Sequence, residues 1–300
     1  MPEYPLVSIV TPVLNMAKYV EETVLSVLAQ DYPRTEYIVM DGGSTDGTLE
    51  IVRRYEGRLR CEPGPDEGAS DAINRGFRLS SGSIFAWLNA DDTYAPGAVR
   101  TAVEHLLAHP EAGGVYGEAN WIGADGGALG RYPVRPFDPE LLSRECFICQ
   151  PASLLRRDVF EQAGHLDPAL HYTFDYDLWI RLSRIARLEK IDAVLANSRM
   201  HRETKTLGSR KEVFRETLGM LRRHYGYAPF SWACAYACFL VDKRDQFFEP
   251  LRPSVPKYAL SLLVGWRYNS QRLRFFKEWA AGLTLPAAVR HLKRTVGRPD

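Results

Sequence analysis

The segment WLNADD, residues 87–92, carries the strongest chemical signal in this chain of 300 residues. An apolar run ends abruptly in Asn89, Asp91 and Asp92, and two adjacent carboxylates repel each other unless a cation or hydrogen-bond donors offset the repulsion. Hard oxygen ligands at a strand end suit Mg²⁺ or Mn²⁺, which takes one or two carboxylates and leaves positions for a diphosphate. The alternative is a cap for the helix expected near Pro96. A cap needs only one acid, so we favour a metal site.

A second polar segment, DGGSTDGT at 41–48, also follows an expected strand. Its glycines permit a tight turn, and Ser44, Thr45 and Asp46 are suitable helix caps. Asp41 differs because it occupies the last strand position, where its carboxylate can accept a hydrogen bond from the N–H of a nucleotide base.

These segments belong to a pattern in which a strand is followed by a helix four times. The strands are expected at 7–13, 37–40, 59–61 and 84–88, and the helices at 19–29, 45–55, 71–79 and 97–107. This alternation predicts an α/β fold with a doubly wound, mostly parallel sheet and helices on both faces. Ligands bind such sheets at the carboxyl ends of the strands, which is where the polar segments fall.

Less regular elements follow. We expect strands at 113–122, 152–155 and 188–196, a glycine-rich hairpin turn at 123–130 and a helix at 175–186. From about residue 210 the pattern is helical, with aromatic and basic residues. The chain is therefore expected to hold one α/β domain at 1–208 and a helical extension at 209–300.

Composition excludes the unusual classes of protein. Apolar residues make up 45% and charged residues 25%, and the net charge of +1 gives no reason to expect a nucleic-acid partner. The charge is uneven, because residues 201–300 hold 19 lysines and arginines against 8 acids. The basic helices at 267–277 and 290–298 predict peripheral contact with an anionic membrane face. A solvated helical cap and a dimer contact remain the alternatives.

The sequence also disfavours several other classes of protein and of site. The pairs Cys146/Cys149 and Cys234/Cys238 allow a zinc site by arithmetic, but their apolar surroundings favour buried thiols in a reducing compartment. Neither GxxxxGK[ST] nor a GxGxxG after the first strand is present, which disfavours P-loop and hydride-transfer enzymes. We expect no secretion signal and no membrane-spanning segment, hence a cytoplasmic protein.

Four motifs together resemble the family 2 glycosyltransferases, which have the GT-A fold. They are SIVTP at 8–12 with Asn15, VMDGGSTDGT at 39–48, DAINRG at 71–76 and SGSIFAWLNADD at 81–92. The resemblance implies a metal-dependent, inverting enzyme that uses a nucleotide-sugar donor and Mn²⁺ or Mg²⁺, in the synthesis of cell-surface polysaccharides or glycoconjugates.

The resemblance also implies roles for individual residues toward the donor. Thr11, Pro12 and Asn15 would line the nucleoside pocket, and Asp41 would accept from a pyrimidine, which favours UDP or dTDP and leaves GDP open. The loop beside the base and diphosphate, with the helix that follows it, would contribute Asp66, Glu67, Gly68, Asp71, Asn74 and Arg75. Arg75 is either a phosphate donor or a solvated helix charge.

In the metal motif, Asn89 stands where the family frequently has an aspartate. Asp91 and Asp92 keep the essential carboxylates, one expected on the metal and one near the ribose or a metal-bound water. His201, in the loop after the last strand, would reach the diphosphate or the metal; the alternative is a surface histidine.

The segment HYTFDYDLWIR at 171–181 resembles the family's segment with the catalytic base. Asp175 takes the base position, and Phe174 stands where an acid commonly precedes it. The alternative for Asp175 is an N-terminal helix charge. Trp179 is expected in the core, Arg181 is expected to pair with Asp177 or an acceptor anion, and QPAS at 150–153 resembles the acceptor-side wall.

The predicted reaction is transfer of a sugar to a hydroxyl of a saccharide or lipid-linked saccharide in a single displacement. Two alternatives remain: a non-catalytic subunit that binds nucleotide sugars or glycans, and a sugar nucleotidyltransferase. A nucleotidyltransferase would need a basic, glycine-rich segment near the first strand to hold a triphosphate, and residues 11–18 contain only one basic residue, Lys18.

Overall fold

The computed structural model describes residues 4–243, 247–248, 251–252 and 254–282. The chain divides into two compact units, one made of residues up to 137 together with 147–200, the other of 138–146 together with the residues from 201 onward. None of the helices in these described ranges is both long enough and apolar enough to cross a membrane.

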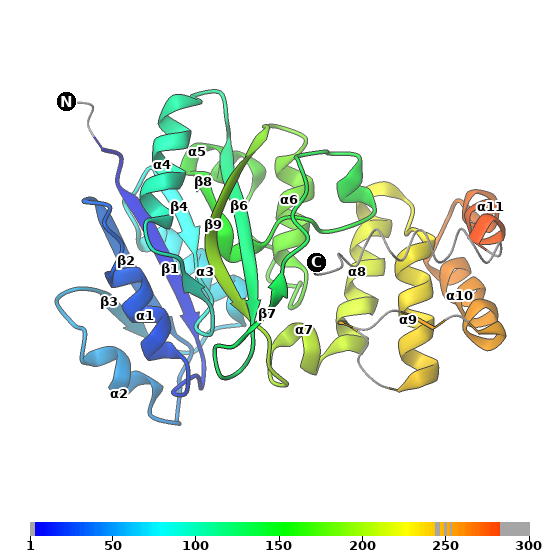
Figure 1. Ribbon diagram of the computed structural model, residues 1–300, viewed down its shortest axis with the longest axis horizontal. Helices are drawn as coiled ribbons and strands as arrows, with labels where there is room; N and C mark the ends of the chain where they lie inside the picture. The colour runs from blue at the N-terminus through cyan, green and yellow to red at the C-terminus, as the bar shows by residue number, and fades with distance from the viewer. Residues whose placement is uncertain (1–3, 244–246, 249–250, 253, 283–300) are drawn as a thin grey trace. The chain divides into compact units, whose positions relative to one another are not determined.

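Parallel strands form one half of the sheet in the first unit. Their order is β3 (Arg60–Pro63), β2 (Thr35–Asp41), β1 (Val7–Val13) and β4 (Ile84–Trp87) (Figure 1). All four lie within one or two residues of the strands expected from the sequence. The predicted doubly wound α/β architecture is confirmed.

The other half of the sheet is mixed. Strand β8 (Ser153–Arg156) runs antiparallel to both β4 and β6 (Gly114–Ile122). Strand β9 (Leu188–Arg199) is parallel to β6, and the short β5 (Thr93–Tyr94) pairs with β9. The expected glycine-rich hairpin is confirmed, because β7 (Ala128–Arg131) pairs antiparallel with β6.

Six α-helices connect the strands of this unit: α1 (Val20–Leu28), α2 (Thr48–Arg53), α3 (Ala69–Leu79), α4 (Ala98–Ala108), α5 (Arg157–Ala163) and α6 (Phe174–Leu182). A 3₁₀ turn at Gln150–Ala152 also belongs to this unit, and another at Leu141–Ser143 belongs to the second unit. The sequence prediction missed α5, β5 and the separate β7. It began α2 three residues early, because Asp46 accepts from the backbone N–H of Thr48 at 3.0 Å and ends the turn there. It also placed the end of α6 four residues too late.

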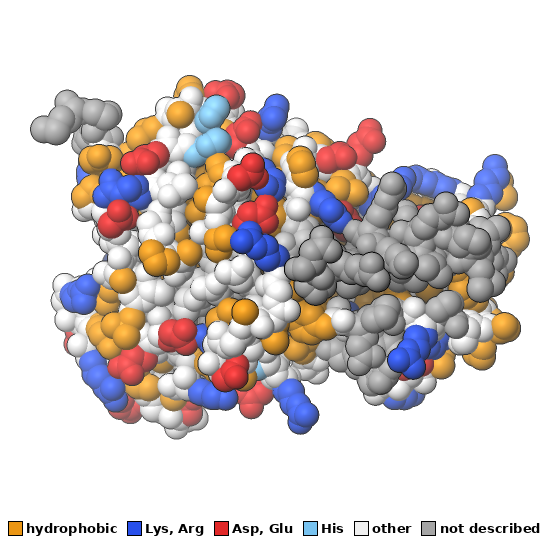
Figure 2. Space-filling view, viewed as in Figure 1, with side chains coloured by type: hydrophobic (Ala, Val, Ile, Leu, Met, Phe, Trp, Pro, Cys, Tyr) orange, Lys and Arg blue, Asp and Glu red, His pale blue; other side chains and the backbone are white. Residues whose placement is uncertain are grey.

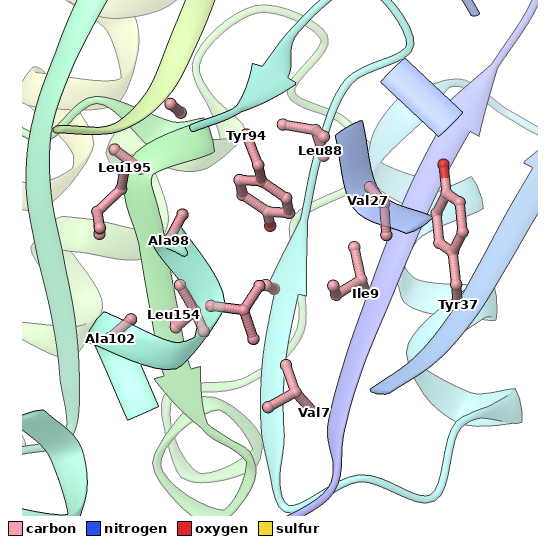
Figure 3. Packing of buried hydrophobic residues seen from close by; sticks show 14 of the residues in the cluster. Val7, Ile9, Val27, Tyr37, Leu88, Tyr94, Ala98, Ala102, Leu154 and Leu195 are labelled. Carbon is pink, nitrogen blue, oxygen red and sulfur yellow. The ribbon is translucent and has the colours of Figure 1, made fainter. Parts of the chain in front are cut away.

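Alternating side chains of the strands build two cores. Ile84 and Ala86 join the aliphatic cluster beneath α1 and α4, part of which Figure 3 shows. Phe85 and Trp87, on the opposite face, contact the aromatic side chains of α3, α5 and α6. Strand β1 is buried along its whole length, as expected for a parallel strand covered on both faces.

The second unit is helical, as expected. It comprises α7 (Lys205–Gly208), α8 (Arg210–Tyr225), α9 (Phe230–Asp242), α10 (Val255–Tyr268) and α11 (Arg272–Gly282). The amide of Asn269, just past α10, bonds the backbone of Ala228 in both directions and so joins the ends of two helices. The basic helix expected at 290–298 lies outside the described residues.

Gly76 tests how tightly α3 packs on the sheet. A Cβ at this position would lie 2.5 Å from a methyl carbon of Val10 and 3.2 Å from Cγ of Met40. We therefore expect Gly76→Ala to lower the free energy of unfolding by about 1–3 kcal/mol, although alanine favours helix. Urea denaturation followed by circular dichroism measures it.

Gly219 provides the matched control, because it also lies inside a helix and an added Cβ would meet nothing within 4 Å. Gly219→Ala should leave stability unchanged or raise it by up to about 1 kcal/mol. Equal midpoints for Gly76→Ala and the wild type would contradict the close packing of α3.

Candidate active site

The loops that follow β1, β2 and β3 meet at one edge of the sheet. Val13 pairs with Asp41, and Asp41 with Pro63, so the three strands end at the same level. Two further backbone bonds continue this contact: Gly42 N–H donates to the carbonyl of Val13 at 2.9 Å, and Gly64 N–H to that of Asp41 at 2.8 Å. The parallel topology thus brings together the polar segments identified in the sequence.

Asn15 joins the first two loops. It has a left-handed φ of 53°, a conformation that asparagine tolerates better than most residues. Its side-chain oxygen accepts from Thr45 N–H at 2.8 Å, and its own N–H donates to Ser44 Oγ at 2.9 Å. The side chain of Asn15, although exposed, therefore shapes the loop around Asp41.

Asp41 is buried, and its two carboxylate oxygens differ. Oδ1 accepts the backbone N–H groups of Gly43 and Ser44, each at 3.0 Å. Oδ2 is buried and has no hydrogen-bond partner among the described residues. A buried acceptor that lacks a donor costs free energy. Asp41 is therefore the acceptor in this loop that most needs a ligand N–H.

Thr11 and Pro12, by contrast, are buried within the sheet. The hydroxyl of Thr11 lies 3.1 Å from that of Tyr37. Burial raises the pKa of Tyr37, and the bond with Thr11 acts in the opposite direction. This pair supports the strands under the loop, so the hydroxyl of Thr11 is already used inside the protein.

The loop between β3 and α3 lies against the end of β2. A Cβ on Gly42 would come within 2.6 Å of Asp66 Oδ2, so only glycine allows Asp66 this position. Hydrogen bonds within the loop hold it: Asp66 Oδ1 accepts from Gly68 N–H at 2.9 Å, and Asp71 Oδ2 from Glu67 N–H at 3.3 Å. Arg75 Nη1 donates to the carbonyl of Pro65 at 2.8 Å, a contact that neither sequence alternative included.

Asn74 is buried and acts on the segment that precedes α6. Its Nδ2 donates to the carbonyl of Leu166 at 2.8 Å, and its Oδ1 accepts the N–H of the same residue at 3.0 Å. The structure thus shows a structural link for Asn74, and its donor role, implied by the resemblance, stays a prediction.

The acidic motif after β4 has one buried and one half-buried carboxylate. Asp92 is 4% exposed; Oδ1 accepts Arg199 N–H at 2.8 Å, and Oδ2 accepts from Asn89 Nδ2 at 3.2 Å. The Asn89 amide also donates to Gln150 Oε1 at 3.3 Å, and Gln150 in turn donates to the carbonyl of Trp87 at 2.7 Å. Asn89 therefore serves as a donor that orients Asp92.

Arg199 is the contact that sequence reasoning missed. It is the last residue of β9, beyond the strand end expected at 196, and it is buried because its side chain has partners on three elements. It donates to the carbonyl of Asp91 at 2.8 Å, to that of Gly123 at 3.1 Å and to Glu22 at 2.5 Å. Its guanidinium also lies 5.0 Å from the ring centroid of Tyr19.

The donor set at Asp91 and Asp92 fits a divalent cation. Burial, and then the charge of Asp91, raise the pKa of Asp92 well above its usual range. A cation beside the pair would reduce this cost. The described residues contain no cluster of three or more acidic, histidine or cysteine ligands. Magnesium and manganese sites commonly take one or two carboxylates and complete their coordination with substrate and water.

Helix α6 holds the predicted base. Asp175 lies in its first turn and is half-buried, and Oδ1 accepts from Tyr176 N–H at 2.8 Å. The expected pair of Arg181 with Asp177 is confirmed at 2.8 Å. Arg181 also donates to the carbonyl of the last residue of α5, Ala163, and to those of the two residues that follow it, which fixes α6 to the end of that helix. Trp179 is fully buried against Trp87, so the expectation of a core residue is confirmed.

His201 belongs to the second unit, directly after the last residue of the first. It is buried, and its carbonyl accepts from the N–H and the hydroxyl of Thr204 at 3.1 and 2.8 Å. Its predicted contact with the donor stays a prediction.

The chain is similar to known glycosyltransferases. The family model "Glycosyl transferase family 2" matches residues 8–164. A curated relative from Rickettsia felis, described as an uncharacterized glycosyltransferase, is 33% identical over 218 residues, which are 69% of this chain and 36% of the relative. The chain thus spans about a third of the length of that relative.

Solved structures share the fold. S. aureus TarS 1–349 in complex with UDP-GlcNAc has a TM-score of 0.63 at 15% identity, over 88% of this chain and 80% of that one. The mannosyltransferase PcManGT from Pyrobaculum calidifontis, in complex with GDP-Man and Mn²⁺, has a TM-score of 0.59 at 20% identity, over 96% and 76% of the chains.

The α/β sheet has the GT-A fold, which it shares with these solved structures. This chain belongs to glycosyltransferase family 2, as its four motifs indicated.

Arg199 should be essential for the stability of this edge. Arg199→Lys keeps the charge but cannot maintain three separate bonds in one plane. We expect the free energy of unfolding to fall by about 2–4 kcal/mol, since hydrogen bonds to charged groups contribute about 1.5–3 kcal/mol each. The measurement is urea denaturation.

The control is Arg54→Lys, in which the arginine pairs with Glu21 at 3.4 Å on the surface. A change within about 0.5 kcal/mol is expected there. If both variants lost the same stability, Arg199 would not have the role that its contacts indicate.

Proposed function

We propose that this chain is an inverting glycosyltransferase that binds a nucleoside diphosphate sugar at this edge, with UDP as the favoured nucleotide. One observation carries the proposal: Asp41 Oδ2, which is buried and has no hydrogen-bond partner in the described part of the chain, lies at the edge of the sheet that also carries the Asp91–Asp92 pair. The complexes of TarS with UDP-GlcNAc and of PcManGT with GDP-Man and Mn²⁺ support it.

The chemistry of Asp41 restricts the base. A carboxylate oxygen accepts only, so it requires an N–H of the base. Uracil, thymine and guanine offer a ring N–H for this contact, whereas adenine and cytosine offer only an exocyclic amino group, which lies elsewhere on the base. We place the base between the Asn15–Ser44 contact and Asp66, with Gly68, Asp71 and Arg75 beside the diphosphate. Thr11 and Pro12 act mainly by supporting the strands beneath these loops, and Asn74 by holding the segment that precedes α6.

Asp91 is the residue that we propose as the direct metal ligand. Both oxygens of Asp92 already accept protein hydrogen bonds, which suits it to a supporting role rather than to the direct ligation suggested by its position in the motif. When bound, Mn²⁺ or Mg²⁺ would neutralise the negative charge that develops on the leaving diphosphate.

Asp175 is proposed as the general base. It takes the proton of an acceptor hydroxyl, whose oxygen attacks the anomeric carbon while the bond from that carbon to the diphosphate oxygen breaks on the opposite face. The nucleoside diphosphate leaves with the bonding electron pair, and the configuration is inverted. The acceptor is a saccharide or a lipid-linked saccharide. The bonds of Arg181 to α5 and Asp177 keep α6, and with it Asp175, in a defined orientation.

A calorimetric panel of UDP, dTDP, GDP and ADP, each with Mn²⁺ and with EDTA, tests the binding site. We expect UDP to bind in a manner that depends on Mn²⁺, and ADP not to bind. Asp91→Asn should reduce binding in Mn²⁺ to the level seen in EDTA. Asp41→Asn should weaken binding about 10–100-fold under both conditions, because it places a donor opposite the base N–H.

Asp192→Asn is the control, since this side chain is 94% exposed and pairs with Lys190 on the surface; it should bind as the wild type does. Absence of binding by all four nucleotides would contradict the proposed function. Binding of ADP as tight as that of UDP would contradict the role of Asp41.

A turnover assay tests the base. Asp175→Asn should lower the rate of transfer by about 10²–10⁴-fold, the usual contribution of a positioned base, while nucleotide binding stays unchanged. The measurement is release of UDP from a UDP-sugar. Asp158→Asn, an acid in the first turn of α5, should leave both quantities unchanged.

Full turnover by Asp175→Asn would exclude this residue as the base. A wild type that binds UDP but releases none from any UDP-sugar would instead indicate the non-catalytic binding subunit.

A further inference from the structure

Helix α10 exposes a continuous apolar stripe. Val255, Leu263 and Trp266 are 83%, 69% and 45% exposed, and Ala259 lies exposed between them. Their spacing of four, four and three residues places all of them on one side of an α-helix. The opposite side of α10 is buried within the helical unit, through Ser261, Val264 and other residues. The stripe is therefore the outer surface of a packed helix.

Helix α11 continues this surface. Leu273 and Phe276, three residues apart, are 69% and 45% exposed. The two helices are in contact, because the ring of Phe275 occupies the space where a Cβ on Gly265 would stand. Arg272 of α11 lies 4.9 Å from the ring centroid of Trp266 of α10, which connects the two exposed surfaces. We call the six residues Val255, Ala259, Leu263, Trp266, Leu273 and Phe276 the α10–α11 face.

Basic side chains accompany this face. Arg267 and Lys277 are exposed next to Trp266 and Phe276 in the sequence, and Arg272 stacks on Trp266. Glu278 is the single acid in the sequence from 254 to 282, and its carboxylate bonds the hydroxyl of Tyr227. The positive charge at this surface is thus not balanced by acids of α10 and α11. Figure 2 shows hydrophobic and basic atoms over these helices.

We infer that the α10–α11 face binds the surface of a bilayer that contains anionic phospholipids. Tryptophan, leucine and phenylalanine on one side of a helix enter the boundary between headgroups and acyl chains, and neighbouring arginines and lysines contact the anionic headgroups. This surface binds a membrane without crossing it. The inference rests on the helical unit alone and is independent of the proposed donor site.

Charge favours a bilayer over a second copy of the chain. In a symmetric dimer the same face would meet itself, which would bring Arg267, Arg272 and Lys277 of both copies together without acids to compensate them. An anionic bilayer instead complements the positive charge and accepts the apolar side chains. The α10–α11 face is a continuous apolar surface, whereas the exposed apolar residues of a soluble protein are normally isolated from one another.

Vesicle co-sedimentation of the full chain tests this inference. The probes are vesicles of phosphatidylcholine alone and vesicles with 40% phosphatidylglycerol, each at 50 and 300 mM NaCl. We expect binding to the anionic vesicles at low salt, weakened at least about tenfold at high salt because exposed charges are screened. Absence of binding to anionic vesicles at 50 mM NaCl, or equal binding to neutral vesicles, would overturn the inference.

Two double variants separate the apolar and the electrostatic contributions. Leu263→Ser with Leu273→Ser, and Arg267→Glu with Lys277→Glu, should each reduce the bound fraction at least about tenfold. The controls are Leu107→Ser, 44% exposed on α4, and Arg78→Glu, exposed on α3; each should bind as the wild type does. Unfolding midpoints show that all variants remain folded, and UDP binding should be the same in all of them.

Sedimentation velocity without lipid tests whether the α10–α11 face instead binds a second copy of the chain. A monomer whose vesicle binding follows the pattern above supports the membrane surface. A dimer that Leu263→Ser with Leu273→Ser converts to a monomer, together with no binding to anionic vesicles, would assign the face to a second copy and overturn the inference.

Discussion

A buried carboxylate beside a second carboxylate is the electrostatic constraint on which the active-site edge depends. Asp92 loses the solvation that would stabilise its charge, and Asp91 adds repulsion. The structure compensates with the N–H of Arg199 on one oxygen and the Asn89 amide on the other. Orientation of the acidic loop thus depends on two residues outside the carboxylate pair, one of them more than a hundred positions away in the chain.

The irregular half of the sheet supplies these partners. The length of β9 carries Arg199 to the end of β4, where its guanidinium bonds the loop after β4, the turn after β6 and Glu22 of α1. The 3₁₀ turn before β8 supplies Gln150, which completes the bonding of Asn89. The regular parallel half supplies the nucleotide loops around Asp41, and the mixed half holds the acidic loop in place.

A similar division separates residues that contact ligands from residues that position them. The resemblance places Asn74 of the motif DAINRG on the donor side, and the structure adds that Asn74 bonds the backbone of Leu166 and so supports the approach to α6. Asn89 occupies an aspartate position and donates hydrogen bonds that an aspartate would not. A motif indicates where in the fold the functional residues lie. The hydrogen-bond partners of each side chain show what that side chain does there.

The sequence by itself determined the α/β class, the four regular strands, the order of the motifs and the family, because these depend on local periodicity and on short segments with specific chemistry. It also predicted the burial of Trp179 and the pair of Asp177 with Arg181, which are one turn apart on the same helix. Only the tertiary structure decided that Arg199 is buried at the acidic loop, that Asp41 keeps one oxygen without a partner and that α10 exposes an apolar stripe. The physical reason is that burial and long-range hydrogen bonding depend on which distant segments meet, and periodicity does not encode that.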